Sequence, residues 1–237
     1  FVFMAEAYWD LEYALQQQGF DYCYDKRLYD RLANEGAESV RGHLTADVGY
    51  QERLVRFVEN HDEPRAAATF VPGKHRAAAV ATLTQTGARL VQEGQLDGRA
   101  VRPPVFLSRR PEEAPDTDLR AFYERLFAAL RDPVFRSGDW QLGDRSGWEG
   151  DDTGKDLVVW GWRGEGPSKL VVVNLGDAPA SGRVRLPWDD LAGRAWRLQD
   201  ARTDEVYERS GDDLRNGLFV ALDPYGWHLF DLRPVGS

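Results

Sequence analysis

The feature that most constrains the fold is a regular alternation of short apolar runs with helix-forming runs, up to about residue 130. Such an alternation predicts parallel strands joined by right-handed crossovers, with each helix packed on the sheet. The expected strands are Phe1 to Ala5, Phe20 to Tyr24, Leu54 to Val58 and Arg89 to Gly94. The expected helices are Leu11 to Gln18, Tyr24 to Leu32, Ala37 to Ala46, Lys74 to Thr86 and Asp116 to Leu130.

The pattern changes from about Gly138, where helical periodicity gives way to short β-branched or aromatic runs between Gly, Pro and Asp turns. Spaced strands with turn signals predict an antiparallel β-sandwich, whose core we expect to contain most of the tryptophans of this segment. The chain is therefore predicted to be α/β and then all-β, with domains at 1–137 and 138–237. The expected strands are Leu157 to Trp162, Lys169 to Leu175, Gly182 to Leu186, Ala195 to Leu198, Leu218 to Leu222 and Trp227 to Leu232.

Two of the predicted parallel strands end in ionisable residues. The run Leu54 to Val58 is followed closely by Asn60-His61-Asp62, and the run Phe1 to Ala5 delivers Glu6. Catalytic side chains gather at the carboxyl ends of parallel strands, because loops there are anchored by the sheet and still reach solvent. Two neighbouring carboxylates are the minimum for cleaving a glycosidic bond, since one donates a proton and the other stabilises positive charge on the sugar.

These segments resemble motifs of glycoside hydrolase family 13, the α-amylase family. The stretch Phe57-Val58-Glu59-Asn60-His61-Asp62 is similar to the motif of the family's seventh barrel strand. Phe3-Met4-Ala5-Glu6-Ala7-Tyr8-Trp9 resembles the fifth-strand motif, and Pro103 to Arg110 is typical of the barrel's end. The resemblance implies units five to eight of an eight-unit TIM barrel, which is half a barrel, followed by a C-terminal β-sandwich.

The resemblance also implies roles for individual residues. Glu6 would be the proton donor, Asp62 the carboxylate that steadies the transition state, and His61 a hydrogen-bond partner of the sugar. The implied function is an α-amylase-like hydrolase that cleaves α-glucosidic bonds of starch or related α-glucans. The binding partner would be an α-glucan oligosaccharide or polysaccharide.

Several residues near these motifs have two interpretations. Asn60 is either a sugar contact or a turn former, and Tyr8 and Trp9 either stack on a sugar ring or pack under the loop. Glu93 and Asp97 follow the last predicted barrel strand, where they line the site or are solvated loop acids.

The family's nucleophilic aspartate lies upstream of the glutamate motif and has no counterpart here, because Phe1 is five residues before Glu6. An active chain would then use Asp62 as nucleophile, with Glu59 and Glu93 as weaker candidates. Two alternatives remain: an inactive fragment of a larger family 13 enzyme, and a carbohydrate-binding protein that has lost catalysis.

Composition argues against several other classes of protein, including nucleic-acid-binding and membrane-spanning proteins. A net charge of −9 argues against nucleic acid, and no apolar run is long enough to span a bilayer. The single cysteine, Cys23, excludes an intrachain disulfide. We expect neither a cofactor nor a metal, because His43, His75 and His228 lack partners at metal-ligand spacing. The family's calcium is not carried over, and the compartment stays open.

An isolated half-barrel would have two unpaired sheet edges. Exposed parallel edges with apolar side chains favour pairing with another chain. We therefore expect a homodimer that closes the barrel; alternatively, the loop from Pro103 to Pro115 or the second domain covers the exposed face.

Overall fold

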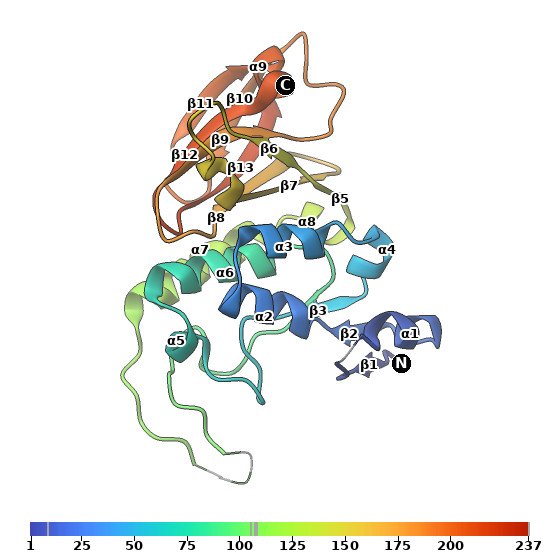
Figure 1. Cartoon of the computed structure of the whole chain (residues 1–237), viewed down its shortest axis with the longest axis vertical. Helices are drawn as coiled ribbons and strands as arrows, with labels where there is room; N and C mark the ends of the chain where they lie inside the picture. The colour runs from blue at the N-terminus through green and yellow to red at the C-terminus, as the bar shows by residue number, and fades with distance from the viewer. Residues whose placement is uncertain (9, 105, 107–108, 237) are drawn as a thin grey trace. The chain divides into compact units, whose positions relative to one another are not determined.

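The computed structural model divides the chain into two compact units (Figure 1). The structure describes residues 1–8, 10–104, 106 and 109–236. The first unit consists of Phe1–Glu35 with Ala46–Glu124, and the second of Gly36–Thr45 with Arg125–Ser237.

The first unit is built on a four-stranded sheet in the order β1-β2-β3-β4. Every adjacent pair is parallel, as the alternation of apolar and helical runs predicted. The strands are short because only two or three residues of each are paired with a neighbouring strand. Their bounds are β1 Met4–Ala5, β2 Tyr22–Tyr24, β3 Leu54–Arg56 and β4 Ala88–Arg89. The run expected to continue to Gly94 thus leaves the sheet after Arg89.

Helices connect these strands, and side chains define several of their ends. Asp25 caps one helix by accepting from the Leu28 N–H at 3.1 Å, and Asp47 caps another through the N–H groups of Gly49 and Tyr50. The helix expected over Lys74 to Thr86 begins earlier, because Pro72 is favourable in a first turn, and ends at Leu83. The helices are α1 Glu12–Gln17, α2 Lys26–Asn34, α4 Val48–Gln51, α5 Ala66–Thr69, α6 Pro72–Leu83 and α7 Thr117–Ala129.

A buried network of charged and polar side chains around Arg56 joins the central strands of this sheet. Arg56 on β3 is fully buried, pairs with Asp25 and Gln51, and donates from Nε to the carbonyl of Thr86 at 3.2 Å. A buried guanidinium is tolerated only when its donors are matched in this way. The network therefore links the end of β2 to β3 and to the segment that precedes β4.

The second unit contains two antiparallel sheets, with orders β11-β10-β13-β8-β7-β5 and β12-β9-β6. Residues from both sheets form one apolar core, which includes Val159, Leu198, Val220 and Phe230. The strands are β5 Asp139–Leu142, β6 Asp144–Ser146, β7 Leu157–Arg163, β8 Ser168–Asn174, β9 Ala180–Arg185, β10 Ala195–Asp200, β11 Val206–Ser210, β12 Leu218–Leu222 and β13 Trp227–Pro234.

Helical elements also belong to this unit, including α3, which precedes β3 in the sequence. The expectation that helical periodicity disappears after Gly138 is wrong for Gly211–Gly217, where Ser210 caps a helix by accepting from the Asp213 N–H. That helix is too short to give a periodic signal. The elements are α3 Ala37–Leu44, α8 Val134–Ser137, the 3-10 helix η1 Thr153–Asp156 and α9 Gly211–Gly217.

The tryptophans of this unit are mostly interior, as alternation along the strands predicted. Trp148, at 44% exposed, is the exception, and it lies against Phe219. The buried ones are Trp140, Trp160, Trp162, Trp188, Trp196 and Trp227. Among the described residues, no helix is both long and apolar enough to cross a membrane.

A buried hydrogen-bonded chain fixes the loop after β4 to the helices of the first unit. Gln95 donates to the hydroxyl oxygen of Tyr123 at 2.9 Å, and that hydroxyl lies 2.9 Å from Nε2 of His75. Because the amide occupies the oxygen as acceptor, the hydroxyl hydrogen is available to the imidazole. Burial lowers the pKa of His75 from 6.5 to about 4. The imidazole is therefore neutral in this network.

We predict that His75 makes the chain sensitive to acid. A depressed folded-state pKa stabilises the fold above pH 6.5, and that stability is lost as the pH falls from 6.5 through about 4. His75→Gln keeps an acceptor for Tyr123 but does not titrate, so its free energy of unfolding should fall less over this range. The expected difference is on the order of 1–3 kcal/mol. Urea unfolding followed by circular dichroism at pH 7.5, 5.5 and 4.5 measures it, and parallel pH profiles would contradict the prediction.

Candidate active site

The parallel sheet brings the two carboxylate segments to one edge. Glu6 follows β1 directly, and Asn60-His61-Asp62 follows β3 after a short extension through Phe57 and Val58. Both strands pair with β2 in parallel register, so their carboxyl ends face the same way. Residues more than fifty positions apart in sequence therefore meet.

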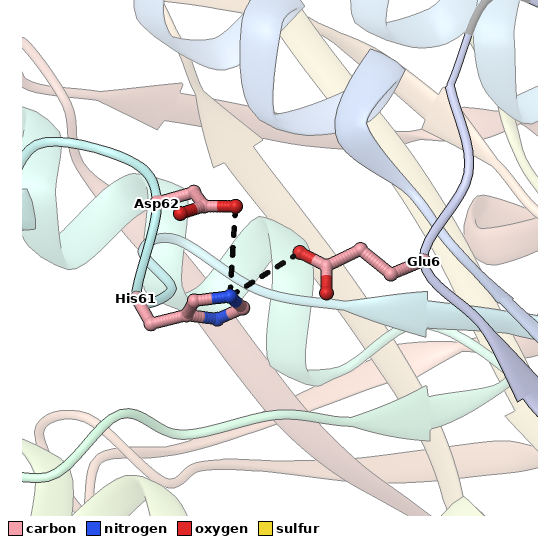
Figure 2. A group of neighbouring side chains, drawn as sticks. All are labelled: Glu6, His61 and Asp62. Atoms are coloured by element: carbon pink, nitrogen blue, oxygen red, sulfur yellow. Dashed lines mark ion pairs between the residues drawn. The ribbon is translucent and has the colours of Figure 1, made fainter. Parts of the chain in front are cut away.

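Figure 2 shows the imidazole of His61 beside both carboxylates. Its Nε2 lies 3.6 Å from Oε1 of Glu6 and 3.5 Å from Oδ2 of Asp62. The side chains are open to solvent, with exposed fractions of 36% for Glu6, 46% for His61 and 52% for Asp62. We call these three residues the Glu6–His61–Asp62 cluster. Its exposure would allow a substrate to reach all three.

Tyr8 supports Glu6 from the same segment. Its hydroxyl donates to Oε1 of Glu6 at 3.2 Å. Burial and the negative charge of Glu6 raise the pKa of Tyr8, so the phenol stays protonated and remains a donor. Tyr8 is thus half-buried and contacts the carboxylate. Trp9, the other predicted aromatic contact, lies outside the described residues.

Asn60 shapes the turn that carries His61 and Asp62. It is 1% exposed, and its Oδ1 accepts from the N–H groups of Asp62 and Glu63, each at 2.9 Å. These bonds are those of an Asx-type turn. They correspond to the turn-forming interpretation of Asn60.

The other carboxylates considered from the sequence pair with arginines. Glu59 is 1% exposed and lies 2.9 Å from Arg65, and burial raises the pKa of Glu59 to about 7. Glu93 is exposed and pairs with Arg110, whereas Asp97 pairs with Arg120. The structure gives each of them an arginine partner of its own.

Arg102 is a charged neighbour of the site that sequence reasoning missed. Its Nε donates to the carbonyl of His61 at 3.2 Å, and its guanidinium lies 3.8 Å from Oδ1 of Asp62. The residue precedes Pro103 in the loop after β4, where no motif distinguishes it from neighbouring arginines. Only the fold, which brings this loop to the Asn-His-Asp turn, reveals the contact.

The cluster combines donor types that metals accept. Within the described part of the chain, Glu6, His61 and Asp62 alone form a group of at least three potential ligands, with one donor atom from each within 4.8 Å of the others. Imidazole and carboxylates suit zinc, but structural zinc sites have four ligands in a closed shell. Three exposed donors that already interact with one another do not by themselves define a metal centre.

The spacing of the carboxylates bears on their chemistry. One oxygen of Glu6 and one of Asp62 lie within 4.8 Å of each other. Inverting glycosidases hold their two carboxyl groups about 6.5 to 9.5 Å apart, and retaining enzymes about 5 to 5.5 Å. The observed spacing is closer to the retaining range, so a proton donor and a negative charge can face the same glycosidic bond.

Comparisons with known proteins agree on one relationship. No protein-family model matches the chain. Over 177 residues it is 30% identical to α-amylase MalA of Haloarcula japonica, a match that covers 71% of this chain and 26% of that protein. The maltogenic α-amylase AmyB of Thermotoga neapolitana superposes with a TM-score of 0.75 at 18% identity. The α-amylase of Geobacillus thermoleovorans, in complex with acarbose, gives 0.74 at 16% identity.

These structural matches cover almost the whole chain but only part of each relative. AmyB is matched over 98% of this chain and 55% of its own, and the Geobacillus enzyme over 98% and 53%. At identities of 18% and 16% the superpositions show a similar fold alone. The match to MalA, at 30% identity, is a similarity of sequence. The chain spans about a quarter of MalA and just over half of the two solved structures. It is related to the α-amylase family, glycoside hydrolase family 13.

Proposed function

We propose that the chain carries a glycosidase site of the α-amylase type, which cleaves α-glucosidic bonds of starch or related α-glucans. The observation that carries this proposal is the meeting of Glu6 and Asp62 across His61 at one sheet edge. The family relationship supports an α-glucan as substrate. Further support comes from similar structures, one an α-amylase in complex with acarbose and another, AmyP, in complex with maltose.

The proposed chemistry assigns a separate task to each carboxylate. Glu6 transfers its proton to the glycosidic oxygen as the bond to the anomeric carbon breaks, and the leaving sugar departs as an alcohol. Asp62 balances the positive charge that develops on the ring oxygen and anomeric carbon. Water then completes the hydrolysis and returns a proton to Glu6. Direct attack by Asp62 on the anomeric carbon, which retention through this pair would require, stays a prediction.

Neighbouring residues prepare the two carboxylates for these tasks. Tyr8 fixes Glu6 by donating to it, and Arg102 lies beside Asp62. His61, between them, is placed to hydrogen-bond a sugar hydroxyl. Asn60 acts through the turn.

A second candidate function is supported by how little of MalA the match covers. Because the chain spans only 26% of MalA, it could serve as a glucan-binding part of a site that needs further residues for catalysis. This is the alternative of an inactive fragment of a larger family 13 enzyme, and a carbohydrate-binding protein that has lost catalysis is a separate alternative with the same readout. Glucan binding without sugar release would favour this candidate.

The first prediction for this function concerns Glu6. Glu6→Gln keeps the size of the side chain but removes the proton donor, so turnover should fall by about 10²- to 10⁴-fold. Reducing-sugar release from soluble starch measures the change, and Glu52→Gln, an exposed carboxylate on the C-terminal side of α4, is the control. Near-full activity of Glu6→Gln would remove Glu6 from the mechanism. A wild-type chain that neither cleaves nor binds starch would overturn both candidates.

We also propose that the first unit is half a barrel, units five to eight, and the second an antiparallel sandwich. The apolar edge supports a partner for this half: Phe1, Val2, Phe3 and Met4 are exposed by 118%, 69%, 60% and 46%. β1 and β4 are the terminal strands of the sheet. A second copy of the chain could pair with both edges and close the barrel.

A homodimer of this kind predicts a mass of twice 26.8 kDa in light scattering. Phe3→Glu should dissociate it, because a charge would enter the apolar contact. Phe219→Glu is the matched control, since Phe219 is equally exposed, at 57% against 60%, but belongs to the second unit. A monodisperse monomer at micromolar concentration would rule out the dimer.

A further inference from the structure

The Asn-His-Asp turn, residues 60–65, has no regular secondary structure although it carries two residues of the proposed site. It lies between the extension of β3 and the short helix α5, Ala66–Thr69. His61 and Asp62 are both roughly half exposed, so packing does little to hold their side chains. The groups that hold this turn must therefore come from its ends.

Glu59 connects the two ends of the turn. Its Oε2 accepts from the N–H of Ala66 at 2.6 Å, and its Oε1 lies 2.9 Å from a guanidinium nitrogen of Arg65. Glu59 precedes the turn, whereas Arg65 and Ala66 end it. Exposed fractions of 1% and 4% place Glu59 and Arg65 in the interior, where water does not compete with the ion pair between them. The next residue, Asn60, adds the two bonds within the turn described above.

Arg65 extends this connection to a second loop. The same guanidinium donates to the carbonyl of Glu93 at 2.8 Å, in the loop that follows β4. Gly94 permits the approach: its φ is +81°, and an added Cβ would lie 3.1 Å from Arg65 and 2.6 Å from Arg99. Gln95 then anchors this loop through its bond to Tyr123.

The two loops also meet at the cluster itself. Arg102, farther along the second loop, donates to the carbonyl of His61 and lies 3.8 Å from Asp62. Glu59 and Arg65 therefore hold the two ends of the turn, and Arg102 contacts its middle at His61 and Asp62. Neither Glu59 nor Arg65 is a member of the cluster, so neither is placed to touch a sugar.

We infer that Glu59 and Arg65 are positioning residues, which set the places of His61 and Asp62 relative to Glu6 by closing the Asn-His-Asp turn and tying it to the loop after β4. The inference rests on the proposed function of the cluster, but its structural part can be measured without activity. Burial raises the pKa of Glu59 to about 7, while the Ala66 N–H and the Arg65 charge lower it. Loss of either partner would leave a buried charge uncompensated.

The test compares Glu59→Gln with Glu12→Gln. Both replace a carboxylate in the interior of the first unit, since Glu12 is only 3% exposed, but Glu12 lies on α1, which belongs to neither loop. Hydrogen exchange of the amides of residues 60–63, 65 and 66 should be at least about tenfold faster in Glu59→Gln and unchanged in Glu12→Gln, because only the former releases a cooperative local unit. Unchanged exchange in Glu59→Gln would overturn the inference, whether or not the chain is active.

A second comparison separates positioning from stability. The double variant Glu59→Gln with Arg65→Met removes both buried charges, which should restore thermal stability relative to Glu59→Gln alone. Positioning requires that kcat on a maltooligosaccharide stays low, by about 10²-fold, because a small misplacement of reacting groups has that effect. Recovery of kcat together with stability would show that the pair is merely structural. If the wild-type chain has no activity, the proposed function fails and the exchange data still decide whether the pair holds the turn.

Discussion

The parallel pairing of β1 and β3 with β2 is the constraint on which the proposed site depends. Because parallel strands end at the same sheet edge, Glu6 and Asp62 meet although 56 positions separate them in the sequence. A shift of β1 by one residue would turn Glu6 to the opposite face, since side chains alternate along a strand. The buried Arg56 network also holds these strands together, because Arg56 at the end of β3 contacts Asp25 after β2 and Thr86 before β4. Register and buried charge thus act together on one edge.

The cluster also illustrates how polar groups are divided between the surface and the interior. Glu6, His61 and Asp62 are exposed and interact loosely, at 3.5 and 3.6 Å, which leaves them free to bind another molecule. Glu59 and Arg65 are buried and form shorter contacts. Buried ion pairs contribute more to specifying a conformation than to net stability in some proteins, and we infer that use here. The exposed residues would perform chemistry, and the buried ones would hold the loop that presents them.

The sequence predicted the parallel sheet and most long elements because their signals are local. Apolar runs located β2 and β3, while apolar residues at helical spacing marked α2 and an alanine-rich stretch marked α6. The antiparallel strands β7, β8 and β13 were equally visible from β-branched and aromatic runs. Short elements such as α9 were missed because seven residues give too little periodicity, and the edge strand β4 was overestimated because pairing depends on neighbours.

The candidate residues themselves could be proposed from sequence, but their supports could not. Strand ends and motif resemblance pointed to Glu6, His61 and Asp62, whereas Arg102 reaches His61 across 41 positions of chain. Likewise, the sequence made Glu59 a candidate nucleophile, because it is an acidic residue after an apolar run. Its burial and its pairing with Arg65 became visible only in the structure. Such contacts arise from loop geometry, which sequence patterns specify poorly.

The most direct test of the account is a crystal structure of the Glu6→Gln chain with maltotriose. The account predicts a sugar at the Glu6–His61–Asp62 cluster, with a glycosidic oxygen within about 2.6–3.2 Å of the residue-6 side chain. Asp62 should face the anomeric carbon of the same bond, and His61 should contact a hydroxyl of that sugar. Maltotriose bound only elsewhere on the chain, with the cluster unchanged, would contradict the assignment of this edge as a glycosidase site.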